Sequence, residues 1–150
     1  MKYSRSEYSA NEDLHIYQFK SVGSKGIITK LVQYSQMNIE GYFNLSFGDL
    51  DSEKREIDDV AISNNGDSKK VLATVVSTLY AFTGKYPNIY VFATGSNEAR
   101  TRLYRIGISN NLGELEKDFK VYGLKIDETF EPFIIGNDYV GFLVKRKIQK

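Results

Sequence analysis

Residues 94–105 carry the polar and basic side chains best suited to holding a ligand. They follow an apolar run, residues 89–93, that is typical of a central strand, and their own pattern predicts a helix. Free backbone amides at a helix start attract anions, and a glycine there lets a ligand approach closely. The stretch predicts an anion site formed by Thr94, Gly95, Ser96, Asn97, Arg100, Arg102 and Arg105. A capped amphipathic helix with solvated arginines fits the same pattern.

A second strand-to-helix turn, residues 64–70, also combines a glycine with basic residues. Its candidate ligand-binding residues are Gly66, Ser68, Lys69 and Lys70. If both helix starts face the same edge of the sheet, they form one basic cleft. The turn lacks the first glycine and the residue order of a P-loop, so a turn followed by a helix cap is the simpler interpretation.

Carboxylates that could hold a divalent metal are concentrated between residues 49 and 59. They are Asp49, Asp51, Glu53, Glu56, Asp58 and Asp59. They do not follow the EF-hand order, and a solvated charged loop explains them more simply. The sequence has no cysteine and a single histidine, His15, which argues against thiolate zinc sites, multi-histidine sites and a Ser-His-Asp triad. We therefore assign no residue as a metal ligand.

The elements that must position these residues form an α+β fold with an N-terminal hairpin. After an irregular lead-in over residues 1–13, we expect strands at 14–22, 26–34, 42–47, 56–63, 89–93, 119–124, 130–135 and 139–145. A first main helix follows residue 67, a second runs to about residue 105, and a short third follows residue 111. The order β-β-β-β-α-β-α-(α)-β-β-β predicts a mixed, mainly antiparallel sheet with two main helices packed on it.

Length and composition limit the classes of protein to which this chain can belong. A chain of 150 residues with a formal net charge of +1 fits one domain and lacks the strongly basic character typical of nucleic-acid binders, although a local basic patch is compatible with it. The absence of cysteine, of a signal peptide and of a long apolar run favours a cytoplasmic protein without a membrane span. Edge strands at both termini leave pairing into a homodimer open.

Two resemblances add to this interpretation. Residues 64–74 and 93–105 look like hallmark stretches of a family of small uncharacterised bacterial proteins, and that similarity extends over the whole chain. Residues 56–108 resemble, more weakly, the middle of the GCN5-related N-acetyltransferase fold. Residues 97–108 are similar to that family's Asn-x-x-Ala-x-x-Leu-Tyr-x-x-x-Gly-Phe segment, with Asn97, Leu103 and Tyr104 in register. Alanine and glycine each fall one place early, and Ile108 replaces the aromatic residue.

The second resemblance implies a coenzyme A thioester as cofactor. It makes Tyr104 the general acid that protonates the leaving thiolate, and it places pyrophosphate on backbone amides near Gly66. It also implies a splayed gap between two parallel strands near Ile62 and Ala93. A packed helix tyrosine is the simpler interpretation of Tyr104.

Three functions therefore stay open. The first is a binding module that needs no cofactor and uses the basic helix at 94–105, with an anionic small molecule, a nucleic acid or an acidic protein surface as partner. The second is an acyl-coenzyme A N-acyltransferase. The third is a metal-dependent nuclease or hydrolase built on the acidic run.

Overall fold

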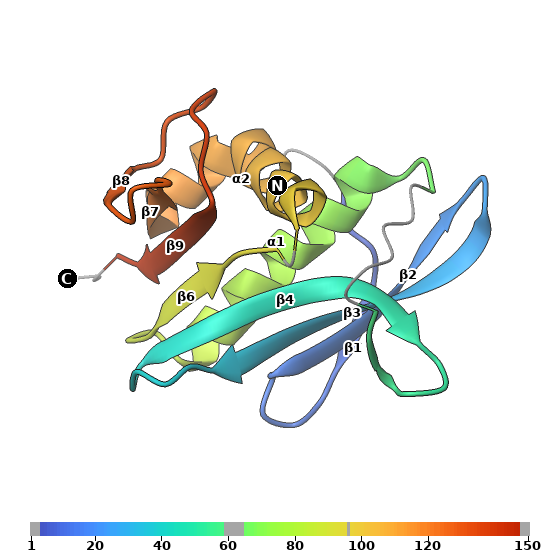
Figure 1. The fold of residues 1–150 in the computed structure, drawn as a ribbon. Helices are drawn as coiled ribbons and strands as arrows, with labels where there is room; N and C mark the ends of the chain where they lie inside the picture. Colours follow the sequence, from blue (N-terminus) through green and yellow to red (C-terminus); the bar gives the residue numbers. More distant parts are fainter. Residues whose placement is uncertain (1–3, 59–64, 96, 148–150) are drawn as a thin grey trace.

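A mixed, mostly antiparallel sheet with both helices on one side forms the protein (Figure 1). The structure, a computed structural model, describes residues 4–58, 65–95 and 97–147. The strands are β1 (Tyr8–Ala10), β2 (Ile16–Gly23), β3 (Gly26–Gln36), β4 (Tyr42–Asp51), β5 (Glu56–Ile57), β6 (Tyr90–Ala93), β7 (Phe119–Leu124), β8 (Phe130–Pro132) and β9 (Gly141–Arg146). The helices are α1 (Ser68–Lys85) and α2 (Glu98–Asp118). The expected α+β class and mixed sheet are confirmed.

The strands follow the order β1-β2-β3-β4-β6-β9-β7-β8, with β5 paired to the end of β4. Strands β4 and β6 are parallel, and the other pairs are antiparallel. The parallel pairing runs from Tyr42–Tyr90 to Leu45–Ala93. Beyond it β6 ends while β4 continues to Asp51, so β4 loses its neighbour at this end.

The two faces of the sheet have opposite characters. On β2, Tyr17, Phe19 and Ser21 are buried, whereas the alternate side chains are exposed. The buried face packs against the apolar sides of α1 and α2, where Leu72, Phe82 and Leu115 belong to one core cluster. Because both helices lie on this face, no helix of the described chain covers the other one (Figure 1). Among the described residues, no helix is long and apolar enough to cross a membrane.

Helix α2 corrects one sequence prediction. We expected it to end near Arg105 and a separate helix to follow residue 111, because glycine and asparagine weaken helices. The helix instead continues to Asp118. Gly107 lies against Leu72 of α1, and the Asn111 side chain donates to the Gly107 carbonyl at 2.8 Å. Tertiary packing and this internal hydrogen bond outweigh the weak local propensity.

Several strand boundaries also differ from the prediction. Of the predicted strand 56–63, the structure describes β5 over Glu56–Ile57 and a non-strand residue at Asp58, and residues 59–63 lie outside the described residues. Strand β4 extends to Asp51, beyond its predicted end at residue 47 and into the acidic run that begins at Asp49. Strand β2 begins at Ile16 because the Asn11 side chain accepts the backbone N–H groups of His15 and Ile16 and closes a turn. The lead-in that we expected to be irregular contains β1.

Candidate functional site

The predicted ligand-binding residues at the starts of the two helices lie along one edge of the sheet, which we call the carboxyl edge. It comprises the ends of β4 and β6, the start of α1 at residues 66–70 and the start of α2 at residues 97–100. The β2–β3 hairpin reaches the same edge, since β3 is antiparallel to β4. Ligands of open sheets with parallel strands commonly bind outside the carboxyl ends of those strands.

A shallow hollow of about 340 Å³ lies at the start of α1. Its lining includes all four residues predicted from the second turn, Gly66, Ser68, Lys69 and Lys70. The lysines are exposed, and the first turn of the helix has no acidic residue. Backbone amides of a first helical turn have no partner inside the helix, so they and the two lysines add positive charge to the hollow, whose lining also includes the Asp67 carboxylate.

The loop before α1 is held by the β2–β3 hairpin. Asn65 is buried, and its side-chain amide donates to the Gly26 carbonyl at 2.9 Å and accepts from the Lys25 N–H at 2.6 Å. The Asp67 carboxylate accepts from the Ser21 hydroxyl at 2.7 Å and, at 3.2 Å, from a backbone N–H of β2, and it makes no side-chain cap on α1. The Asp67 side chain therefore fixes the loop to the sheet and does not cap the helix.

The start of α2 is packed more tightly than its sequence indicated. The Asn97 side chain accepts from the Arg100 N–H at 2.9 Å, a side-chain cap, and the Gly95 N–H donates to the Thr101 hydroxyl at 3.1 Å. A Cβ on Gly95 would lie 2.4 Å from the Thr101 nitrogen. The close approach that we attributed to a ligand is thus made by the helix itself. Thr94 is half-buried next to this turn, and Ser96 lies outside the described residues.

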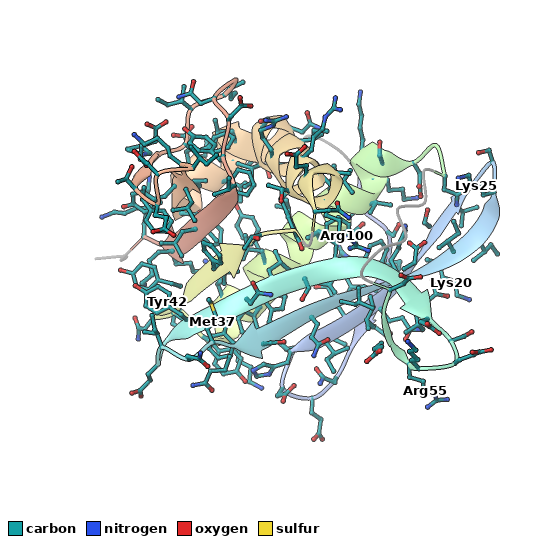
Figure 2. All side chains as sticks on the ribbon, in the orientation of Figure 1. Lys20, Lys25, Met37, Tyr42, Arg55 and Arg100 are labelled. Carbon is teal, nitrogen blue, oxygen red and sulfur yellow. The ribbon has the colours of Figure 1, made fainter. Side chains whose placement is uncertain are left out.

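Arg100 is buried and points from α2 to the edge of β4 that β6 leaves unpaired (Figure 2). Its guanidinium donates to the Phe47 carbonyl at 2.6 Å and also to the carbonyl of Asp58. It packs over Gly48, where an added Cβ would lie 2.8 Å from the nearest guanidinium nitrogen. Arg100 therefore joins β4 to the segment after β5 across the space where β6 has ended.

Tyr104 lies one turn further along α2 and faces the same gap. Its side chain is buried, its hydroxyl donates to the Leu45 carbonyl at 3.2 Å, and its ring meets Phe47 edge-on at 5.3 Å. Leu45 is the last β4 residue paired with β6. The hydroxyl thus lies at the point where the parallel strands separate.

The three predicted arginines do not form one surface. Arg100 is buried, Arg102 is exposed, and Arg105 forms an ion pair with the exposed Asp138 at 3.1 Å. A buried ion pair of Lys30 and Asp49, on the helix-covered face near the same edge, was not foreseen from the sequence. Lysine and aspartate at facing positions of neighbouring strands were its only signal.

The acidic run does not gather into a metal site in the described part of the chain. No group of three or more histidine or acidic side chains is placed to hold an ion there, and Asp59 lies outside the described residues. Asp49 is engaged by Lys30, and the Asp51 carboxylate accepts backbone N–H groups of the β4–β5 turn.

Comparison with known proteins identifies the family and not an activity. A family model described as a family of unknown function, DUF6934, matches residues 2–147, and the chain belongs to that family. Neither the curated proteins nor the solved structures contain a significant match to the chain.

Proposed function

We propose that this member of a family of unknown function is a binding module for an anionic, phosphate-bearing small molecule held at the carboxyl edge. The observation that carries the proposal is the hollow at the start of α1, where Gly66, Ser68, Lys69 and Lys70 come together. Loop geometry supports it, because the Asp67 carboxylate is held by the hairpin while the two lysines stay exposed. The buried Arg100 lies at the same edge but does not line the hollow, so the proposed site rests on the start of α1.

A second candidate is an acyl-coenzyme A N-acyltransferase, and one observation favours it. The parallel strands β4 and β6 separate beyond Leu45–Ala93, with the Tyr104 hydroxyl at the point of separation. The strand that separates from β6 is β4, and Ile62, where the resemblance placed the gap, lies outside the described residues. Tyr104 is the residue that the acetyltransferase resemblance makes a general acid.

The side chain of Arg100 favours binding over acyl transfer. In the acetyltransferase segment, alanine stands three residues after the asparagine, and here that position is Arg100. Its guanidinium occupies the opening between the strands and donates to the β4 carbonyls there. A thioester arm would have to displace a buried cation from its hydrogen bonds, which is costly.

Calorimetry at low salt with pyrophosphate, ADP, coenzyme A and acetyl-coenzyme A tests both candidates. We expect saturable binding of the phosphate ligands, weakened about 5- to 30-fold in the double variant Lys69→Ala/Lys70→Ala, since exposed ion pairs contribute about 0.5–1 kcal/mol each. The matched control is Lys85→Ala/Lys125→Ala, which removes two lysines from the last turn of α1 and from the residue after β7. Equal affinity in both double variants would refute the α1 site.

The same titration separates the two candidates. Two results together would establish the acyltransferase instead. Coenzyme A would bind more tightly than ADP, and the protein would release thiol from acetyl-coenzyme A in a reaction that Tyr104→Phe abolishes. Binding of pyrophosphate and ADP with no gain from the pantetheine arm is the result that the binding module predicts.

A further inference from the structure

The sheet face that the helices leave uncovered has a composition of its own. On the four strands β4, β6, β9 and β7, the side chains pointing away from the helices alternate with the buried core residues. None of the described positions on this face of these strands is acidic, and two are lysines. We call this surface the open face. It comprises the even-numbered positions of 42–50, 90–92 and 120–124 and the odd-numbered positions of 141–145.

One cross-strand row on the open face combines aromatic rings with cations. Strand pairing places Tyr42 beside Tyr90, Tyr90 beside Lys145, and Lys145 beside Lys120. The two tyrosine rings are stacked, with centroids 4.7 Å apart and planes 8° from parallel, and the Lys145 ammonium lies 5.8 Å from the Tyr90 centroid. Tyr42 stands at the start of β4, at the end of the sheet remote from the carboxyl edge (Figure 2).

The next row continues the same character. Pairing aligns Asn44 with Phe92, Phe92 with Leu143, and Leu143 with Tyr122. Phe92 and Tyr122 are half-buried, so part of each ring reaches the surface. Together the rows offer aromatic area for stacking and an amide for hydrogen bonding.

A basic hollow adjoins the cationic end of the first row. It measures about 310 Å³, and its lining includes Lys117, Lys145, Arg146 and Lys147. The acidic side chain in the lining, Asp118, accepts from the Tyr80 hydroxyl at 2.7 Å. Among the described residues, Lys145, Arg146 and Lys147 donate to backbone carbonyls and a threonine hydroxyl, and none of them pairs with a carboxylate. In the described part of the chain, the four basic side chains that line this hollow therefore outnumber its one carboxylate.

We propose that the open face binds single-stranded nucleic acid, with bases on the tyrosine row and phosphates on the lysines and the basic hollow. Exposed aromatic rings on a sheet stack unpaired bases, and neighbouring cations follow the backbone. The bases of a duplex are already stacked on one another, so their faces cannot stack on the tyrosine rings. An acidic protein surface would match the charge but not the stacked tyrosines, so the combination selects a single strand. This site is independent of the anion site at the carboxyl edge.

Fluorescence anisotropy with labelled 12-nucleotide single-stranded RNA and DNA, and with a 12-base-pair duplex, tests the proposal. At about 50 mM salt we expect saturable binding of single strands and weaker binding of the duplex. Tyr90→Ala should reduce affinity about 5- to 150-fold, the range for loss of one base stack, while Tyr90→Phe keeps the affinity because it keeps the ring. Lys120→Ala/Lys145→Ala should lower the slope of log affinity against log salt by about 1.4, or 0.7 for each phosphate that a lysine no longer neutralises.

The control is Lys85→Ala/Lys125→Ala, which removes two lysines outside both proposed sites, in the last turn of α1 and just after β7, and should leave oligonucleotide binding unchanged. Three outcomes would overturn the proposal: no saturable binding of single strands, equal binding of duplex and single strand, or equal affinity of Tyr90→Ala and Tyr90→Phe. If Tyr90→Ala unfolds by circular dichroism, quenching of tyrosine emission by unlabelled oligonucleotide decides with the natural chain, because stacked rings must be quenched. Concentration-dependent dimerisation that Lys120→Ala/Lys145→Ala abolishes, without oligonucleotide binding, would assign the face to a second copy of the chain.

Discussion

Replacing Arg100 with leucine tests whether this arginine is a structural link or a ligand-binding residue. Its guanidinium is buried and donates to the backbone carbonyls of Phe47 and Asp58. Leucine keeps an apolar side chain on α2 but removes the charge and both donors. The Phe47 carbonyl then faces the gap between β4 and β6 without this donor.

The magnitude follows from these contacts. Hydrogen bonds to a charged group contribute about 1.5–3 kcal/mol each, so the two donors together account for about 3–6 kcal/mol. Burial of the leucine side chain returns roughly 1–2 kcal/mol. We therefore expect Arg100→Leu to lower the free energy of unfolding by about 3 kcal/mol, which corresponds to a fall in Tm of about 6–12 °C for a domain of this size.

Urea unfolding followed by circular dichroism measures this loss, and Arg102→Leu is the matched control. Arg102 lies two residues further along the same helix and is exposed, so its replacement should change the free energy of unfolding by less than about 0.5 kcal/mol. If the two variants unfold at the same urea concentration, Arg100 is not buried in the gap. Arg100 would then return to the set of exposed arginines available to a ligand.

Two further predictions concern the same edge and the core. Gly95→Ala should lower the free energy of unfolding in urea by about 1–3 kcal/mol, because a Cβ would lie 2.4 Å from the Thr101 backbone nitrogen. An unchanged urea midpoint would show that α2 begins elsewhere. Burial raises the pKa of the Tyr34 hydroxyl well above 10, although its hydrogen bond to Thr78 opposes the shift. The unfolded chain therefore loses this proton at lower pH than the folded chain. The contribution of Tyr34 to the free energy of unfolding is complete below about pH 10 and declines as the pH rises further. Urea unfolding between pH 8 and 11 should show a shallower decline in Tyr34→Phe, and an identical decline in both proteins would contradict the assignment.

Local pattern was sufficient for most of the sheet. Alternation of Phe43, Leu45 and Phe47 with polar neighbours predicted β4, and the same alternation left one side of that strand free of core residues. Local pattern failed where distant contacts decide the conformation. The length of α2 depends on how Gly107 meets Leu72 of another helix, and that contact has no local signature.

The candidate site shows the same division. A strand ending in a glycine turn before a basic helix was visible in the sequence, and a capped helix was one of its two interpretations, but the sequence analysis did not name Asn97 as the cap. The direction of each arginine was not visible, because a helix with arginines at positions 100, 102 and 105 presents them on different sides and only the packed sheet decides which side is buried. The row Tyr42–Tyr90–Lys145–Lys120 was equally hidden, since it joins four strands that are brought together only by the final strand order.

The position of Arg100 links these observations to function. A strand that outruns its neighbour exposes backbone carbonyls, and those carbonyls must be satisfied by a ligand, by water or by the protein itself. On β4 the protein supplies its own donors, the Tyr104 hydroxyl at Leu45 and the Arg100 guanidinium at Phe47. A chain that fills the gap in this way has less need of a ligand there. The two surfaces proposed for ligands are the hollow at the start of α1 and the uncovered face of the sheet, and these are where mutation should separate binding from stability.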